Sequence, residues 1–152
     1  MPLISSLGVM NAINFGLASS SPMLLSWVYC SSLVSVFAGY SVNAITWNGS
    51  VFVAVGANGK CATSSDGITW TNQAGFATVF GTTYPANAIA WNGSVFIVVG
   101  YSKCATSSDG ITWTSQPGLF TPNGNFSPYG VAWNGSKFVV IGASGNCLTS
   151  PD

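Results

Sequence analysis

The chain has 152 residues, of which 48% are hydrophobic and only 4% are charged, and its formal net charge is zero. It contains no arginine, histidine or glutamate, and only three lysines and three aspartates. The side chains that acid–base catalysis, metal centres and nucleic-acid surfaces require are therefore too few to support these functions. We therefore expect one ordered, non-enzymatic domain without a cofactor or metal.

Residues 1–20 lie outside the pattern that fills the rest of the chain, so we expect a leader or anchor segment before a repeat domain at 21–152. They lack the positive n-region of a signal peptide, and no clear export signal is present. Residues 22–40 carry no charge and are long enough for a transmembrane helix. Their serines, β-branched residues and register with the later repeats favour a strand, so we do not expect membrane insertion.

A unit of about 43 residues occurs three times. The string WNGS begins at Trp47, Trp91 and Trp133. Three cysteines and three aspartates each recur at intervals of 43 residues: Cys61, Cys104 and Cys147, and Asp66, Asp109 and Asp152. Such regular spacing indicates a repeat architecture.

Within the first unit, four short strands are expected at 44–47, 51–55, 60–64 and 68–71. Asn48 and Gly49 join the first two, and this dipeptide is a strong hairpin signal because both of its residues tolerate a positive φ. Four antiparallel strands in about 43 residues are typical of a β-propeller blade. A β-trefoil, which also has three four-stranded repeats in this length, is the alternative.

The N-terminal segment is expected to close the fold. Trp27 precedes Trp47 by about the interval that separates Trp70 from Trp91, so residues 24–29 are predicted to be a fourth strand that completes the last blade. The strand could complete the last blade of its own chain or, in a head-to-tail assembly, that of another copy. Three blades are too few for a ring, which typically has four to eight. A head-to-tail dimer of six blades, an open fibre and a fragment of a longer protein are the possibilities that the sequence leaves open.

The segment TSSDGITW, at 63–70 and again at 106–113, resembles the Asp-box of bacterial neuraminidase repeats, although its Asp and Gly are adjacent. Together with WNGS, it is similar to sialidase-like propeller repeats of phage and bacterial structural proteins. The resemblance implies that eight residues hold the turns between strands three and four: Ser64, Asp66, Gly67, Trp70, Ser107, Asp109, Gly110 and Trp113. Sialidase catalysis needs an arginine triad and a Tyr/Glu pair, so activity is not implied here.

The repeated tryptophans and cysteines are expected to be structural. Trp70 and Trp113 are predicted to pack between blades rather than stack on sugars. The three repeated cysteines are predicted to be small buried hydrophobic residues, too far apart for disulfides. Cys30, at another repeat position, could pair only by an accident of ring closure.

The segments 73–85 and 116–129 differ between repeats and are expected to be long loops between blades. Binding residues are commonly found in loops on a rigid scaffold. The candidate ligand contacts are therefore their aromatic residues: Phe76, Phe80, Tyr84, Phe120, Phe126 and Tyr129.

The sequence favours a non-catalytic structural protein that associates with copies of itself. Residues 1–20 also resemble short leaders of phage tail and fibre proteins, which implies a virion or extracellular location, other virion proteins as partners and contact with a host surface. The alternative is a lectin-like propeller that binds glycans through pockets between its blades. Nucleic acid is not an expected partner.

Overall fold

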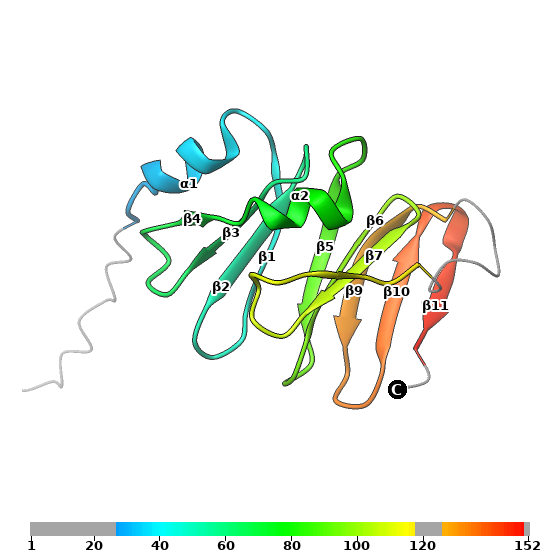
Figure 1. Ribbon diagram of the computed structural model, residues 1–152. Helices are drawn as coiled ribbons and strands as arrows, with labels where there is room; N and C mark the ends of the chain where they lie inside the picture. The colour runs from blue at the N-terminus through cyan, green and yellow to red at the C-terminus, as the bar shows by residue number, and fades with distance from the viewer. Residues whose placement is uncertain (1–26, 118–125, 151–152) are drawn as a thin grey trace, which may run out of the picture.

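The computed structural model describes residues 27–117 and 126–150, which form three antiparallel sheets side by side (Figure 1). We call them blade 1, blade 2 and blade 3. Blade 1 consists of β1 (Val42–Trp47), β2 (Phe52–Gly56), β3 (Cys61–Ser64) and β4 (Thr71–Asn72). Blade 2 consists of β5 (Ala86–Trp91), β6 (Phe96–Gly100), β7 (Lys103–Ser107) and β8 (Thr114–Ser115). Blade 3 consists of β9 (Pro128–Trp133), β10 (Phe138–Gly142) and β11 (Cys147–Thr149).

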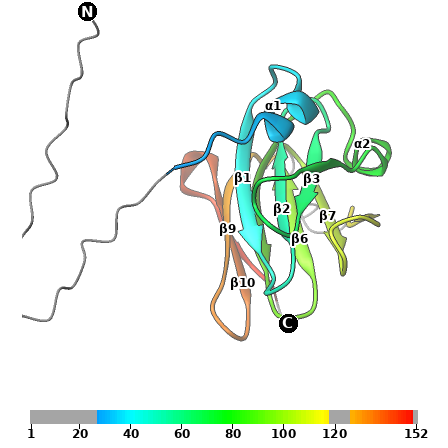
Figure 2. The ribbon, with the colours of Figure 1, turned by 90° about the vertical axis from the view of Figure 1, so that its left-hand side faces the viewer.

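The three sheets repeat one topology, in which each strand pairs with the strand that follows it in the chain. The first strands of neighbouring blades, β1, β5 and β9, lie next to one another, so the sheets meet along these strands (Figure 1). Figure 2 gives the view from the side of α1 and β1. The only other described elements are α1 (Ser31–Phe37), α2 (Gly75–Phe80) and the short 3-10 helix η2 (Ala143–Gly145). The predicted all-β class and the three repeats are confirmed.

The hairpin turn differs in detail from the prediction. Within the WNGS turn of blade 1, Gly49 has a positive φ of 99° whereas Asn48 does not. Gly49 and Ser50 are the two central residues of the turn, because Asn48 donates its N–H to the Val51 carbonyl at 3.2 Å. The Asn48 side-chain oxygen accepts the N–H groups of Ser50 and Val51. Asparagine therefore serves as a hydrogen-bond acceptor beside the turn, and only glycine supplies the positive φ.

The fourth strands are shorter than predicted. β4 covers two residues rather than the four at 68–71, because the N–H groups of Ile68 and Thr69 are bonded to Asp66 and are not available to a sheet. The same arrangement shortens β8.

The predicted N-terminal strand does not form in its described part. Residues 27–30 have no regular structure, and α1 follows and packs on β3 and β4 of blade 1. Phe37 is buried there together with Trp70, and Leu33 and Val36 pack against the same cluster. Blade 3 lies at the other end of the molecule and has three strands (Figure 1). Residues 27–29 therefore do not complete the last blade of their own chain, and that version of the prediction is wrong for them; completion of the last blade of another copy stays a prediction. Residues 24–26 lie outside the described residues.

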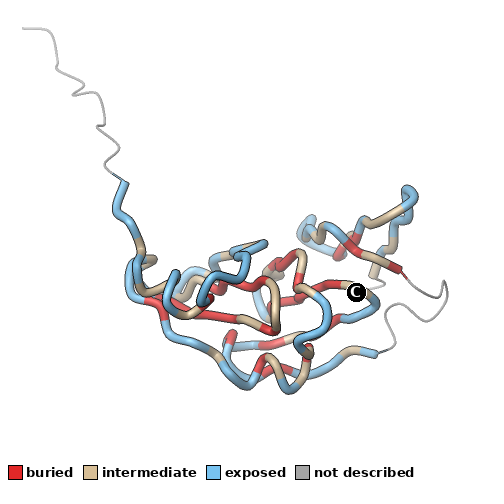
Figure 3. The backbone as a smooth tube through the Cα atoms, turned by 90° about the horizontal axis from the view of Figure 1, so that it is seen from above, coloured by how far each residue is buried: buried red, intermediate tan, exposed pale blue. Residues whose placement is uncertain are grey.

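The core lies between the blades, where the buried stretches of backbone gather (Figure 3). Alternate residues of a strand point to opposite faces of its sheet, so each blade has a leading face toward the preceding blade and a trailing face toward the next one. The trailing face of blade 1 packs on the leading face of blade 2 through a cluster that includes Val53, Val55, Cys61, Phe96 and Val98.

A second cluster joins blade 2 to blade 3 in the same way. It contains Ile97, Val99 and Cys104 from the trailing face of blade 2, and Phe138 and Val140 from the leading face of blade 3. The nearly continuous apolar run of β6 follows from this arrangement, because both faces of blade 2 are covered.

Two asparagines bond neighbouring blades together. Asn43 of β1 donates its side-chain N–H to the Ala86 carbonyl at 2.9 Å, and Asn87 of β5 donates to the Pro128 carbonyl at 2.8 Å. These bonds fix how β1, β5 and β9 lie relative to one another.

Candidate functional site

The turn after β3 is held by Ser64 and Asp66. The Asp66 Oδ1 atom accepts hydrogen bonds from the Thr69 N–H at 2.7 Å, the Ile68 N–H at 2.8 Å and the Ser64 hydroxyl at 2.9 Å. Gly67, with a φ of 73°, donates its N–H to Ser64 Oγ. These bonds, that from the Thr69 backbone foremost, hold the pKa of Asp66 well below its usual range.

Blade 2 repeats the turn. Asp109 Oδ1 accepts from the Thr112 N–H, the Ile111 N–H and the Ser107 hydroxyl at 2.7, 2.8 and 2.9 Å, and Gly110 donates its N–H to Ser107 Oγ. Partial burial acts to raise the pKa of Asp109, but the hydrogen bonds to its carboxylate outweigh it and leave the pKa lowered. Both carboxylates are engaged in holding their turns.

The tryptophans of the two turns are buried. Trp70 donates its ring N–H to the Gly67 carbonyl at 3.1 Å, and Trp113 donates to the Gly110 carbonyl at 3.2 Å. Trp113 also packs edge-on against Phe76, with the ring centroids 5.1 Å apart. Within the chain, neither ring presents an open face for a sugar.

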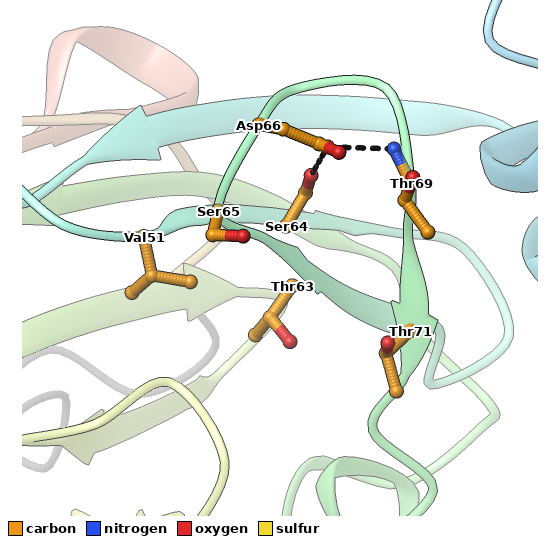
Figure 4. A pocket seen from close by; sticks show the side chains of 7 residues that line it. All are labelled: Val51, Thr63, Ser64, Ser65, Asp66, Thr69 and Thr71. Atoms are coloured by element: carbon orange, nitrogen blue, oxygen red, sulfur yellow. Dashed lines mark hydrogen bonds between the residues drawn. The ribbon is translucent and has the colours of Figure 1, made fainter.

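A polar hollow lies beside the turn of blade 1 (Figure 4). Its volume is about 460 Å³, and hydroxyl groups provide most of its polar lining. The lining residues are Val51, Thr63, Ser64, Ser65, Asp66, Thr69 and Thr71. Five of them lie in strands predicted from the sequence, and Ser65 and Asp66 lie in a predicted turn; the sequence did not indicate that they form one concave surface.

The predicted aromatic ligand contacts are mostly not surface residues. Phe76, Phe80 and Phe126 are at most 1% exposed, so the prediction is wrong for them. The segment at 75–80 is the helix α2 rather than an open loop, and its phenylalanines face the blades. Tyr84 is exposed and stacks on Tyr101, with ring centroids 4.4 Å apart. Phe120 lies outside the described residues.

Three phenylalanines have one shared structural role that the sequence analysis missed. Phe37, Phe80 and Phe126 lie against glycines that end the second strands of their blades. A Cβ atom on Gly100 would come within 2.8 Å of the Phe80 ring, and the other two blades are equally tight. The repeat spacing of 43 residues between Phe37 and Phe80 was the available signal.

Tyr129 is also exposed, but it lies in the strand β9 rather than in a loop. Tyr129 lies four positions before Trp133, as Asn87 lies four positions before Trp91. Blade 3 thus carries a tyrosine where blade 2 has the asparagine that bonds the next blade.

The cysteines fall into two groups. Cys61 and Cys104 are buried, and burial raises the pKa of each thiol to about 12, a hydrogen bond with Trp113 acting in the opposite direction at Cys61. Cys147, at the same repeat position, is exposed, so the prediction of a buried residue is wrong for it. Cys30 is half-buried, and its thiol donates to the Gly67 carbonyl.

The two ends of the three-blade block are partly uncovered. On the trailing face of blade 3, Ile141 is 55% exposed, whereas Val55 at the same position of blade 1 is fully buried. On the leading face of blade 1, Ile45 is 54% exposed, whereas Ile89 of blade 2 is 7% exposed. The residues that form the interior contacts between blades therefore recur, without a neighbour, at both ends.

The open face of blade 3 is hollowed. An apolar depression of about 210 Å³ is lined by Gly130, Val131, Ala132, Val139 and Ile141. Each of these residues belongs to β9 or β10. A side chain from a facing sheet would fit such a depression, as side chains do in the two interior contacts.

Two searches of the described residues gave negative results. None of their helices is long and apolar enough to span a membrane. Nor do three His, Cys, Asp or Glu side chains come together in the described part as potential metal ligands.

Comparison with known proteins gives a structural likeness. No protein-family model and no curated protein matches the chain. Among solved structures, the chain is similar to a structure described as YCF48 bound to D1 peptide, with a TM-score of 0.62 and 19% sequence identity. YCF48 is a β-propeller protein, and the match covers 74% of this chain. The fold is that of β-propeller blades.

This likeness favours the propeller over the β-trefoil alternative. The chain spans 38% of the length of the YCF48 chain that it matches, and at this level of identity only the fold is shared. The resemblance of the two turns to the Asp-box stays a prediction.

Proposed function

We propose that the chain is a non-catalytic assembly module whose copies join head to tail. In this assembly the trailing face of blade 3 in one copy packs on the leading face of blade 1 in the next. The observation that carries the proposal is the exposure of Ile45 and Ile141 at positions where the interior blades are buried. Burying one such side chain contributes about 1.5–3 kcal/mol.

A head-to-tail contact is heterologous, so it closes into a ring or extends into a fibre according to the rotation between copies. Two copies would supply six blades, within the usual range for a closed ring. The low charge of the chain and the resemblance of its repeats to those of phage structural proteins support a place in a virion or fibre, in contact with other virion proteins and a host surface.

Electron microscopy of the negatively stained full chain tests the proposal. We expect rings or fibres for the natural chain and for Ile111→Asp, because Ile111 is equally exposed, at 54%, but lies in the turn of blade 2. Ile141→Asp would place a charge in the contact and leave single particles of one chain. Rings or fibres that persist in Ile141→Asp would show that the open face of blade 3 is not the contact.

The non-catalytic part of the proposal rests on residue chemistry. Without arginine or glutamate in the chain, a sialic acid carboxylate has no guanidinium partner and a glycosidic bond has no Glu acid or nucleophile. We expect no hydrolysis of sialosides by the assembled protein. Turnover that Asp66→Asn abolishes would contradict this, because Asp66 is assigned here to the turn.

Glycan binding is a second candidate function, and the polar hollow of blade 1 favours it. Its hydroxyls can both donate to and accept from the hydroxyl groups of a neutral sugar. A glycan array probed with the full chain tests this function. Binding through the hollow would be lost in Thr71→Val, which removes one lining hydroxyl at nearly constant volume, and kept in Thr114→Val, the matched change in blade 2.

A further inference from the structure

The exposed segment just before α1 has a defined partner in the repeat. Trp27, Val28 and Tyr29 are 87%, 65% and 78% exposed and belong to no sheet. Val28 and Tyr29 lie 43 residues before β4 (Thr71–Asn72), which in turn lies 43 residues before β8 (Thr114–Ser115). They therefore occupy the repeat position of a fourth strand.

In blade 3, the described residues include no fourth strand. Its described part ends with β11, which pairs with β10 on one side, whereas the equivalent strands β3 and β7 also pair with β4 and β8. The outer edge of β11 thus corresponds to an edge that is covered in both other blades. An edge strand exposes N–H and C=O groups that can pair with another chain.

The packing of α1 on blade 1 directs the preceding residues, 27–29, away from that blade. α1 packs on β3 and β4 as α2 packs on β7 and β8, and Phe37 covers Gly56 as Phe80 covers Gly100. In blade 2, the residues immediately before α2 are the outer strand of the preceding blade. The residues immediately before α1 therefore leave blade 1 where the outer strand of a preceding blade would lie.

Further bonds fix this exit point. The Ser32 hydroxyl donates to the Ile68 carbonyl at 2.6 Å and accepts the Trp70 N–H at 3.1 Å. These contacts tie the start of α1 to the turn of blade 1. The segment before it cannot reach β11 of its own chain while they hold, because α1 and β11 lie at opposite ends of the block (Figure 1).

We propose that Val28–Tyr29 of one copy pairs with β11 of the preceding copy and supplies the fourth strand of its blade 3. This inference rests on the proposed self-association and adds the strand that is exchanged and its register.

The register follows from the two fourth strands that the structure describes, β4 and β8. Thr71 and Asn72 lie opposite Thr63 and Ala62.

In blade 2, Thr114 and Ser115 lie opposite Thr106 and Ala105. Val28 and Tyr29 stand at the repeat positions of Thr71 and Asn72, and Thr149 and Leu148 stand at those of Thr106 and Ala105. The same register therefore places Val28 opposite Thr149 and Tyr29 opposite Leu148. Both observed pairs continue with one further bond, in which Gln73 donates its N–H to the Cys61 carbonyl and Gln116 to the Cys104 carbonyl, each at 2.8 Å.

In the proposed pairing, the bond equivalent to that between Gln73 and Cys61 would place two cysteines of neighbouring copies opposite each other. Cys30 stands at the position of Gln73, and Cys147 stands at the position of Cys61. Directly opposite residues of an antiparallel, hydrogen-bonded pair have Cα atoms about 5.5 Å apart, within the range of about 4.4–6.8 Å that a disulfide spans. The accident of closure that the sequence analysis required for Cys30 is thus a consequence of the repeat.

The other two cysteines do not compete, because Cys61 and Cys104 are buried. Oxidation of the full chain by copper(II) phenanthroline tests the register. Each link formed takes two electrons from two thiols, releases two protons and makes one S–S bond. We expect covalent dimers and longer ladders on a non-reducing gel, with Cys30 joined to Cys147 in the peptide map.

Two serine variants sharpen the experiment. Cys30→Ser and Cys147→Ser should each give no ladder alone, whereas their mixture should give covalent dimers only, because one productive pair remains. Moving the thiol by one residue, with Leu148→Cys in the Cys147→Ser chain, turns it to the other face of β11 and should lower the yield at least tenfold. A short bis-maleimide should link the same pair if the disulfide geometry is unfavourable.

The outcomes separate this inference from the proposed function. A Cys30–Cys147 link within single chains would overturn exchange between copies, and Cys147–Cys147 dimers would indicate a symmetric contact instead. Oligomers that neither reagent links through Cys30 and Cys147 would overturn the strand exchange and leave self-association standing. A chain that stays monomeric would overturn both.

Discussion

Blades 2 and 3 share a sequence pattern but differ in their neighbours. Blade 2 is covered on both faces, and its Val99 and Cys104 are buried, whereas Ile141 and Cys147 at the same positions of blade 3 are exposed. The pattern therefore sets which side chains point outward from a sheet, and an adjoining blade decides whether they are buried. Both faces of a blade are covered only when it lies between two others.

Blades 2 and 3 also differ in sequence at one position that contacts the next blade. Blade 3 has Tyr129 where blade 2 has Asn87, whose side chain bonds the next blade. A copy that docks on blade 3 thus lacks this amide bond and depends more on apolar packing and on strand pairing. Contacts between copies are for this reason expected to be weaker than contacts within a chain.

The largest expected effect contrasts two tryptophans at one repeat position. Trp113→Ala removes a ring that is buried between blades 1 and 2 and should lower the free energy of unfolding by about 3–5 kcal/mol. Trp27→Ala removes a ring that is exposed in the single chain, so it should leave the unfolding of the monomer nearly unchanged and weaken self-association. Urea denaturation of both variants, followed by circular dichroism, checks the contrast. Equal losses would show that Trp27 packs within its own chain.

A smaller effect is expected at the glycines beneath the phenylalanines. Gly100→Ala would bring a Cβ against the Phe80 ring and the Pro85 carbonyl, and overpacking of this kind costs about 1–3 kcal/mol. Gly75→Ala, at a helix position with open space around it, is the control and should change stability by less than about 0.5 kcal/mol. Denaturant midpoints would measure both, and an unaffected Gly100→Ala would contradict the tight packing.

The acid dependence of stability tests the two turns. Hydrogen bonds hold the pKa of Asp66 and Asp109 below the ordinary value in the folded chain. Their carboxylates therefore stabilise the fold fully above about pH 4, and this contribution is lost as the pH falls through the lower folded-state pKa. Asp109→Asn should lower the melting temperature at neutral pH and lose less on acidification than the natural chain. Parallel melting curves that differ by the same amount from neutral to acid pH would contradict this.

The smallest effect concerns thiol reactivity. Burial raises the pKa of Cys61 and Cys104 to about 12, so a soluble disulfide reagent such as Ellman's should modify Cys147 first, Cys30 more slowly and the buried pair only on unfolding. Dilution into monomers should speed the reaction at Cys147, because blade 3 then loses its neighbour. Rapid labelling of Cys104 in the native chain would show that blades 2 and 3 separate readily.

Much of the fold was readable from spacing, because the WNGS strings and the cysteines mark equivalent strands in each blade. The spacing did not reveal α1 and α2, whose short sequences lack charged residues and capping side chains, although Phe37 and Phe80 share the repeat interval. Local propensity favoured a strand before Cys30, but packing of Leu33, Val36 and Phe37 on blade 1 selects a helix just after it.

The candidate site was less readable for a related reason. Phe76 and Phe126 are aromatic residues in variable segments, which is the usual description of a binding loop, yet they fill the space between blades. The polar hollow of blade 1 consists of small residues such as Thr63 and Thr71 that come from two strands. Its concavity depends on the strand pairing and on no motif of its own.

The molar mass of the full chain in solution, measured by sedimentation equilibrium over a range of concentrations, tests the central claim most directly. The account predicts species of two or more copies of the 15.6 kDa chain, which Ile141→Asp converts to folded single chains and Ile111→Asp does not. A mass of 15.6 kDa at every concentration, with Ile45 and Ile141 both open to solvent, would contradict it.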